Sequence, residues 1–274
     1  MILRVPCPAK LNLFLSVGPA DHRGYHPLRT IFQAVSLFDE LLVEHSDRDE
    51  VICSDPAVPA DNTVSRTLRL LAEVVELPRL KVTLNKNIPS QAGLGGGSSD
   101  AAGLIRAAKV LSRHGLPHAE MFGLAQTIGA DVPFFLVGGR AKAEGYGERL
   151  QELADEMNEW FVLAKPPVGC DTKASFQKLD EKSYSWREFP DPLELYNDFE
   201  RVAPCECIEL IERLQVHGAT GAGLTGSGSA VFGKFPDERE ARKAAEIAEQ
   251  ESSARVWVVR SLTRAESLQV QVAN

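Results

Sequence analysis

Hydrophobic and polar residues alternate along residues 8–17, where Lys10, Asn12 and Ser16 occupy the polar positions. A period of two is typical of a half-buried strand with one polar face. Other alternating or apolar stretches predict strands over 31–45, 50–54, 80–84, 160–164, 220–225, 229–235 and 255–260. Apolar residues three or four apart predict helices that follow Asn62, begin near 98, start at Pro117, and span 171–180, 204–216 and 237–250.

Strands and helices are mixed along the chain without strict alternation, so the sequence predicts an α+β fold. With 274 residues, the chain is long enough for two domains of ordinary size. We place the boundary just before the apolar strand at 160–164, which gives expected domains of residues 1–155 and 156–274. The least regular stretch, residues 181–198, is predicted to be a surface loop.

The acidic composition narrows the classes of function. The sequence has 30 Lys and Arg against 38 Asp and Glu, a net charge of −8, whereas nucleic-acid and anionic membrane surfaces attract proteins with positive charge. Its start resembles no signal peptide, and no apolar run approaches the ~18 residues that cross a membrane. The five cysteines include no CxxC pair, which favours reduced thiols. We expect a soluble, cytoplasmic protein that binds neither nucleic acid nor membrane.

A glycine-rich segment precedes the helix expected near residue 98. Residues 89–100 read Pro-Ser-Gln-Ala-Gly-Leu-Gly-Gly-Gly-Ser-Ser-Asp, and the four glycines leave backbone N–H groups free to turn toward one point. The helix start adds unpaired N–H groups and the positive end of its dipole. We therefore predict a phosphate site in which Ser98 or Ser99 caps the helix and a serine hydroxyl could contact Mg²⁺ or a phosphate. The alternative is a flexible linker.

Two familiar nucleotide-binding signatures are excluded by their context. The glycine-rich segment is not a Walker A loop, because no Gly-Lys-Ser/Thr follows it. Residues 221–226 match G-x-G-x-x-G formally, but a strand-like stretch follows where a dinucleotide site requires a helix.

Two further segments are candidates for chemistry. Asp131 lies between a helix end at Gly129 and an apolar stretch fixed by Pro133, which we expect to be a strand. Such an aspartate would be held in place and could act as a general base, and the alternative is an ordinary turn aspartate. Residues 224–233 place small residues between two strands, where the backbone can approach a ligand or the neighbouring domain. An ordinary hairpin is the alternative there.

Together with Pro-Ala-Lys-Leu-Asn-Leu at 8–13, these three segments resemble the GHMP small-molecule kinases, in that family's order. Four shorter motifs, Gly24-Tyr25-His26, Asp61-Asn62, Gly145-Tyr146-Gly147-Glu148 and Asn197-Asp198-Phe199-Glu200, resemble a branch whose substrate carries a cytidine diphosphate group. The resemblance implies an N-terminal domain like the second domain of ribosomal protein S5, a ferredoxin-like C-terminal domain and an active site between them. It also implies an ATP- and Mg²⁺-dependent kinase that phosphorylates an alcohol in the non-mevalonate route to isoprenoids.

The resemblance assigns roles to single residues as well. Asp131 would accept the proton of the substrate's C2 hydroxyl, and Lys10 would stabilise charge on the transferred group. Substrate contacts would come from Asn12, Tyr25, His26, Thr172 and Phe176, with Tyr25 and Phe176 stacking on cytosine and His26 bonding its edge. The residues around the ATP phosphates would be Pro89, Ser90, Gln91, Ala92, Gly93, Leu94, Gly95, Gly96, Gly97, Ser98 and Ser99, with Ser99 as a candidate Mg²⁺ ligand.

Some alternatives stay open on the sequence. From spacing alone, Lys10 would be a solvated lysine on an exposed strand face. Relatives often carry tyrosine near the position of Phe176, so an aromatic face is kept here while the phenol hydroxyl is lost. Another GHMP kinase, acting on a sugar or a mevalonate-like acid, is the second candidate function. A non-catalytic nucleotide-binding protein is the third, and it fits poorly with the presence of both Lys10 and Asp131.

Overall fold

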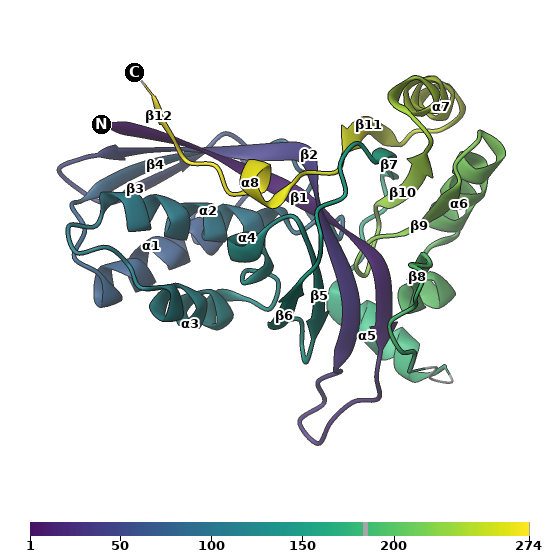
Figure 1. Cartoon of the computed structure of the whole chain (residues 1–274), viewed down its shortest axis with the longest axis horizontal. Helices are drawn as coiled ribbons and strands as arrows, with labels where there is room; N and C mark the ends of the chain where they lie inside the picture. Colours follow the sequence, from purple (N-terminus) through teal and green to yellow (C-terminus); the bar gives the residue numbers. More distant parts are fainter. Residues whose placement is uncertain (183–185, 274) are drawn as a thin grey trace.

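The computed structural model describes residues 1–182 and 186–273, and its strands form two sheets (Figure 1). The larger sheet follows the order β12-β1-β2-β4-β3, with β8 paired to β1 and with β5 joining β2 to β6. Its strands are β1 (Ile2–Val17), β2 (Leu28–His45), β3 (Glu50–Cys53), β4 (Leu80–Asn85), β5 (Arg140–Glu144), β6 (Arg149–Glu152), β8 (Tyr196–Asn197) and β12 (Gln271–Ala273).

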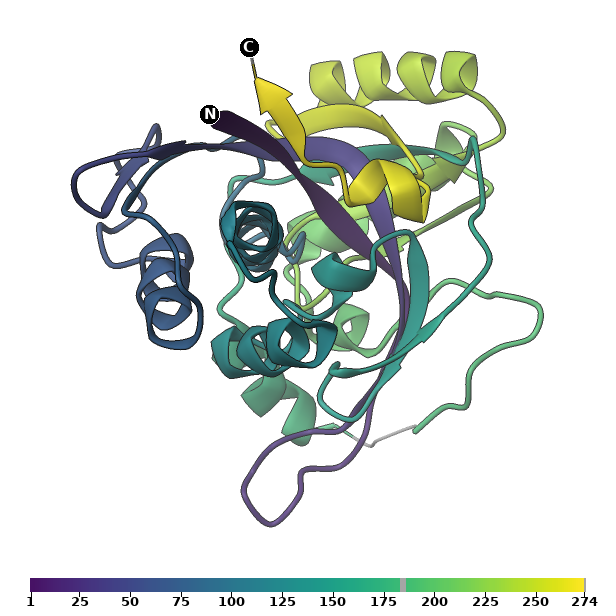
Figure 2. The ribbon, with the colours of Figure 1, turned by 60° about the vertical axis from the view of Figure 1, so that its left-hand side comes forward.

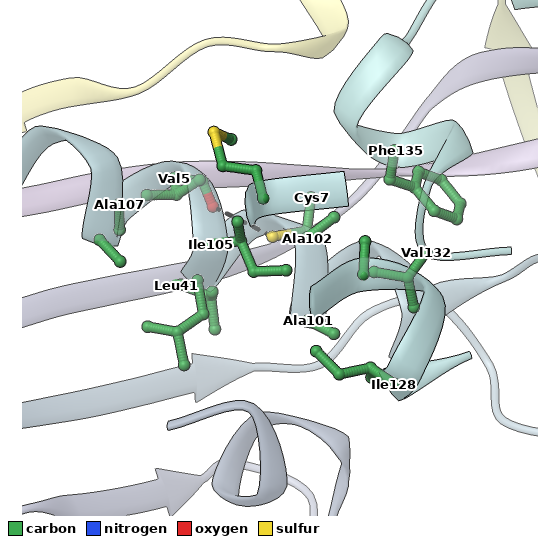
Figure 3. Packing of buried hydrophobic residues seen from close by; sticks show 14 of the residues in the cluster. Val5, Cys7, Leu41, Ala101, Ala102, Ile105, Ala107, Ile128, Val132 and Phe135 are labelled. Carbon is green, nitrogen blue, oxygen red and sulfur yellow. Dashed lines mark hydrogen bonds between the residues drawn. The ribbon is translucent and has the colours of Figure 1, made fainter. Parts of the chain in front are cut away.

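Helices cover one face of this larger sheet (Figures 1 and 2). They are α1 (Thr63–Val74), α2 (Gly96–Leu111), α3 (His118–Ile128) and the short α4 (Phe134–Val137). The central helix α2 lies close to β1, because a side chain at Gly103 would place its Cβ only 2.4 Å from Cys7 Sγ. Figure 3 shows Cys7 in this core, close to Ala102 and Ile105 of α2, which are fully buried.

The smaller sheet has the order β11-β7-β10-β9 with antiparallel neighbours. Its elements are β7 (Trp160–Lys165), α6 (Cys205–Val216), β9 (Gly221–Leu224), β10 (Val231–Phe235), α7 (Glu238–Glu251) and β11 (Arg255–Arg260). This succession is the βαββαβ pattern of ferredoxin-like domains. Val162 packs with the residues of α6 and α7, whereas Leu163 on the opposite face packs with Leu11 and Leu13 of β1.

Three short elements complete the chain: α5 (Thr172–Asp180), the 3₁₀ helix η1 (Asp198–Val202) and α8 (Arg264–Ser267). Two strands that follow β7 in sequence return to the larger sheet, since β8 and β12 both pair with β1. The pairing of Ile2 with Ala273 brings the two chain ends together (Figure 1). The domain boundary near residue 155 stays a prediction.

Most predicted elements are present, but three local expectations are wrong. Lys10, Asn12 and Ser16 are buried and do not form a solvated polar face. The glycine-rich loop, the β9–β10 hairpin and the segments that carry Arg187 and Asp198 contact these side chains. Residues after Pro133 form the helix α4 and not a strand. β5 and β6 were not predicted, since their short stretches carry many charged residues.

The predicted surface loop at 181–198 is confirmed in part. Residues 183–185 lie outside the described part of the chain, and residues 186–194 are mostly exposed. The end of the stretch is ordered by pairing, because Tyr196 and Asn197 lie beside Phe14 and Leu15 of β1. Within the described residues, the helices are all too short or too polar to cross a lipid bilayer.

Candidate active site

The glycine-rich segment forms a tight loop that opens directly into α2. Gly93 and Gly95 have left-handed backbones with φ of 74° and 73°, a conformation that glycine adopts without steric cost. Gly95 is the N-cap of α2, and no side chain of the described residues caps this end. The expected cap at Ser98 or Ser99 is therefore wrong, because the helix begins earlier and both serines lie in its first turn. The exposed N–H groups at this end suit an anionic ligand.

A buried charge cluster holds the base of this loop. Asp39 accepts hydrogen bonds from the backbone N–H groups of Asn87 (2.6 Å) and Ile88 (2.8 Å), just before the loop. Lys86 donates to Asp39 and, at 2.8 Å, to Asp100 in the first part of α2. Burial, with the nearby Asp39 carboxylate, raises the pKa of Asp100 well above its usual range. The cluster ties β2, the loop entry and α2 together, and sequence motifs gave no signal for it.

The small-residue hairpin between β9 and β10 packs against the glycine-rich loop. The Thr225 hydroxyl donates to the carbonyl of Gly93 at 3.2 Å, and the N–H of Ala230 donates to the carbonyl of Ala92 at 3.1 Å. The hairpin at 224–233 therefore approaches the neighbouring glycine-rich loop closely, and its approach to a ligand stays a prediction. The contact closes the phosphate loop from the side of the smaller sheet.

Gly93 gives a sharp test of this contact. An added Cβ would lie 2.0 Å from the Thr225 carbonyl oxygen, so Gly93→Ala must push the loop and the hairpin apart. Overpacking of this kind typically costs about 1–3 kcal/mol, and we expect a Tm lower by about 5 °C or more, with weaker binding of an ATP analogue. Gly115→Ala is the matched control, because Gly115 has φ of 73° and no atom within 4 Å. Equal effects of the two substitutions would contradict the proposed packing role.

Lys10 lies on β1, beneath the glycine-rich loop. Its backbone N–H donates to the carbonyl of Leu94 at 3.0 Å, and its Nζ lies 3.8 Å from Asp131 Oδ2. The side chain is only 3% exposed, so the solvated alternative is wrong. Burial lowers the pKa of Lys10 below the ordinary lysine value, and the Asp131 carboxylate opposes that shift.

Asp131 lies in the turn between α3 and α4, and its side chain is about one third exposed. Its carboxylate is thus open to the solvent side while Lys10 approaches it from the buried side. The structure brings together the two residues that the resemblance implied as a catalytic pair. A carboxylate beside an ammonium group can take a proton from an alcohol while the ammonium group faces developing negative charge.

Asn12 orients the end of Lys10. Its Oδ1 accepts hydrogen bonds from Lys10 Nζ and from the N–H of Gly226 at 2.9 Å, while its Nδ2 donates to Thr30 at 2.8 Å. The residue is buried, and these bonds connect both sheets at the lysine. A contact of Asn12 with the substrate stays a prediction.

A cavity of about 1200 Å³ opens beside Asp131 and contains most of the predicted substrate residues. It is bounded by the β1–β2 loop, the start of α2, the turn before α4, the β5–β6 turn and α5. Its lining residues are Arg23, Gly24, Tyr25, His26, Leu28, Ser98, Ala130, Asp131, Tyr146, Thr172, Lys173, Phe176, Gln177 and Asp180. Ser98 connects this space to the phosphate loop.

The aromatic residues of the cavity are arranged in two pairs. His26 stacks on Phe176 with ring centres 4.9 Å apart, and its Nε2 lies 3.4 Å from Asp180 Oδ1. Tyr25, 63% exposed, meets the ring of Tyr146 edge-on at 5.9 Å. Tyr25 and Phe176, which were expected to stack on the two sides of a cytosine, both line this cavity. They do not form a pair, because Tyr25 contacts Tyr146 and Phe176 contacts His26.

Thr172 and several residues that motifs did not single out complete the lining. The Thr172 hydroxyl lies 2.9 Å from that of Ser227 in the small-residue hairpin. Arg23, Lys173 and Asp180 were missed, because the resemblance assigned roles only to Tyr25 and His26 in the β1–β2 loop and to Thr172 and Phe176 in α5. Tyr146 had a signal, since it lies in the Gly-Tyr-Gly-Glu motif, although no role followed from it.

Ser99 is the side chain that could assist a metal ion. Its Oγ is buried and has no hydrogen-bond partner among the described residues, so it is available to a ligand at the start of α2. The described residues contain no cluster of three or more His, Cys, Asp or Glu side chains that could hold a metal ion.

Comparison with known proteins agrees with this geometry. The model of the GHMP kinases N terminal domain matches residues 62–139, and the model of the GHMP kinases C terminal domain matches residues 191–253. The chain belongs to the GHMP kinase family. The predicted α+β, two-domain fold of that family is thus confirmed.

Within this family, the chain is similar to proteins with one name. It is 36% identical to the 4-diphosphocytidyl-2-C-methyl-D-erythritol kinase of Syntrophus aciditrophicus, across 95% of this chain and 100% of the relative. The enzyme of the same name from Geobacter metallireducens is 37% identical, across 95% and 99%.

Solved structures give the same picture. A crystal structure of 4-(cytidine 5'-diphospho)-2C-methyl-D-erythritol kinase has a TM-score of 0.83 and 34% identity, and the match covers 94% of this chain and 98% of the other. A homoserine kinase from Cytophaga hutchinsonii has a TM-score of 0.71 at 18% identity, across 96% and 95% of the chains. The second match bears on the fold alone.

Proposed function

We propose that the chain is a 4-diphosphocytidyl-2-C-methyl-D-erythritol kinase, which transfers the γ-phosphoryl group of ATP to the substrate's C2 hydroxyl in the non-mevalonate pathway of isoprenoid biosynthesis. The observation that carries this proposal is the single cavity in which Asp131, Ser98 and the aromatic residues meet. Ser98 connects the cavity to the loop proposed to bind the triphosphate, Asp131 would be the base, and the rings and His26 would meet a pyrimidine. The relatives of that name, matched over nearly their whole length, support the same substrate.

The proposed reaction uses Asp131, Lys10 and the glycine-rich loop together. Asp131 accepts the proton of the C2 hydroxyl as that oxygen attacks the γ-phosphorus of ATP. The new oxygen–phosphorus bond forms as the bond from the γ-phosphorus to the β–γ bridging oxygen breaks, and ADP leaves. Lys10 and the N–H groups of residues 93–99 stabilise charge on the transferred group. Both act through fixed positions, since Lys10 is buried and the loop is packed from two sides.

A magnesium ion is part of this proposal. Bound with ATP, Mg²⁺ would neutralise charge on the phosphates. Ser99 would be its protein contact, because that hydroxyl is buried without a partner in the described chain. The chain's own share of the work is to hold the triphosphate at α2 and to keep Lys10 and Asp131 in reach of the γ-phosphate.

Recognition of the cytidine end would rely on the rings of the cavity. Stacking on an aromatic side chain contributes about 1–3 kcal/mol per base. Tyr25 has an exposed ring, whereas Phe176 already stacks on His26 and would meet the base at the part of its ring that lines the cavity. The contacts that hold His26 include a 3.0 Å approach of Nδ1 to the Gly18 carbonyl, the neighbouring Asp180 and the stack on Phe176. Its ring is therefore oriented before a base arrives.

All five cysteines are free, and since disulfides are rare in the cytosol, we propose a cytoplasmic location.

An ADP-release assay separates this function from the alternatives. The purified protein is incubated with ATP and, in separate reactions, with 4-diphosphocytidyl-2-C-methyl-D-erythritol, galactose, homoserine or mevalonate. Of the four alcohols, we expect the cytidyl substrate and no other to give ADP release above background. Turnover of another alcohol without use of the cytidyl compound would replace the proposed substrate, and ATP binding without any turnover would favour the non-catalytic alternative.

A further inference from the structure

The turn between β5 and β6, residues 145–148, lies against the loop between β1 and β2, residues 18–27, which we call the tip loop. The N–H of Leu28 donates to the carbonyl of Gly145 at 2.6 Å. The tip loop extends beyond the larger sheet in both overall views (Figures 1 and 2). It carries Tyr25 and His26, so whatever holds this loop also places the proposed cytosine-binding residues.

Asp21 is the centre of the tip loop. Its Oδ1 accepts hydrogen bonds from the N–H groups of Arg23 (2.8 Å) and Tyr25 (3.0 Å). Its Oδ2 accepts from the Arg23 guanidinium (3.1 Å) and from the hydroxyl of Tyr146 (2.6 Å). The Tyr146 hydroxyl is the largest cause of the low pKa of Asp21. One carboxylate thus folds the loop on itself and fastens it to the β5–β6 turn.

The Tyr146 ring provides a second contact with the same loop. It meets the Tyr25 ring edge-on at 5.9 Å, with an angle of 69° between the planes. The Arg23 guanidinium lies over both rings, 5.4 Å from the centre of Tyr146 and 5.8 Å from that of Tyr25. Because Tyr25 is exposed, these contacts and the bonds to Asp21 are what fixes its direction.

The β5–β6 turn also lies beside the catalytic segment. At Gly147, where φ is 115°, an added Cβ would lie 3.6 Å from the Ala130 carbonyl oxygen and 3.8 Å from Asp131 Oδ1. One short turn therefore contacts both the tip loop and the neighbourhood of the proposed base. It fixes the span between the cytosine-binding rings and Asp131.

We propose that Tyr146 and Asp21 are positioning residues that determine specificity for a pyrimidine nucleotide substrate. The bond from the Tyr146 hydroxyl to Asp21 holds the tip loop, and through it Tyr25, at the distance from Asp131 that the cytidine-bearing alcohol spans. This inference rests on the proposed function and adds to it the residues that set the substrate's position. The proposed ATP site at residues 89–99 takes part in none of the contacts named for Asp21 and Tyr146, so ATP binding should not depend on this bond.

Tyr146→Phe removes the hydroxyl and keeps the ring. We expect the KM for 4-diphosphocytidyl-2-C-methyl-D-erythritol to rise about tenfold, as for a hydrogen bond to a charged group, with kcat and the KM for ATP within about twofold. Asp21→Asn should raise the same KM, and the double variant should be no worse than the poorer single variant, because both remove one interaction. Titration calorimetry with cytidine 5'-diphosphate should show the same loss of affinity without turnover.

Tyr196→Phe is the matched control. The Tyr196 hydroxyl also donates to an aspartate, Asp198, at 2.5 Å, but it does not line the cavity. We expect no change in the KM for the cytidyl substrate in that variant.

The outcomes separate the two proposals. If the wild-type protein does not phosphorylate the cytidyl substrate, the proposed function fails. If it does, and Tyr146→Phe leaves both that KM and the cytidine 5'-diphosphate affinity unchanged, the inference is overturned. It is also overturned if the effects of Tyr146→Phe and Asp21→Asn multiply in full in the double variant, or if Tyr146→Phe lowers Tm and worsens the constants for both substrates equally.

Discussion

Replacing Asp131 by asparagine should lower kcat by about 10²–10⁴, the usual contribution of a positioned general base. Asparagine keeps the shape of the side chain but cannot take the proton of the attacking alcohol. In the wild type, Lys10 Nζ lies 3.8 Å from the carboxylate. The amide oxygen of the asparagine would still lie near this ammonium group, so the fold should be retained. Single-turnover and steady-state ADP release, with calorimetry for an ATP analogue, separate loss of chemistry from loss of binding.

The control for this substitution is Asp47→Asn, in the exposed turn between β2 and β3. It makes the same chemical change away from the cavity and should leave kcat unaltered. A value of kcat for Asp131→Asn within a few-fold of the wild type would exclude Asp131 as the base. The role of the residue would then be limited to positioning.

Lys10→Ala should have the second largest effect, a fall in kcat of about 10²–10³, comparable to the removal of one preorganised charge-stabilising donor. The loss in ATP affinity should be smaller, because the N–H groups of the phosphate loop remain. Lys10 is buried beside Asn12 and the Phe32 ring, 5.4 Å away, so Lys10→Met is the companion variant that fills most of the space without the charge.

Steady-state kinetics with varied ATP measure both constants for these variants. The two substitutions should lower kcat alike, whereas Lys243→Ala, on the exposed face of α7, should have no effect. If Lys10→Ala raised the KM for ATP and left kcat unchanged, Lys10 would be a binding residue. If Lys10→Met restored kcat, the packing of the side chain and not its charge would account for the loss.

Local chemistry made part of the site predictable from the sequence. The glycine-rich loop and the helix after it were predictable because glycine content and a following helix are properties of one short stretch; binding of phosphate there stays a prediction. The helix start itself was misplaced, because serine is a common N-cap, while the left-handed Gly95 ends the loop before the serines are reached. The error matters for function, since a glycine cap leaves the N–H groups to a ligand.

The pairing of Lys10 with Asp131 came from the resemblance and not from the spacing of residues. Alternation along β1 predicted an exposed lysine, because the sequence near it does not reveal that the glycine-rich loop and the small-residue hairpin cover that face. Burial imposed by a distant part of the chain is a tertiary effect that a local pattern cannot report.

The cavity lining depended even more on distant contacts. The bond between Asp21 and Tyr146 joins residues 125 positions apart, and α5 contributes cavity residues from a helix that carries no motif. The Gly-Tyr-Gly-Glu motif marked the right segment, but its role became visible only when its turn was seen between the tip loop and Asp131.

A crystal structure with a non-hydrolysable ATP analogue and the cytidyl alcohol is the sharpest test of whether the glycine-rich loop binds the triphosphate while Asp131 contacts the reacting hydroxyl. We expect the β- and γ-phosphates to lie against the N–H groups of residues 93–99 and the cytosine to lie at Tyr25, His26 and Phe176. The C2 hydroxyl should lie within hydrogen-bond reach of the Asp131 carboxylate. A triphosphate bound away from the start of α2, or a C2 hydroxyl out of reach of Asp131, would contradict this arrangement.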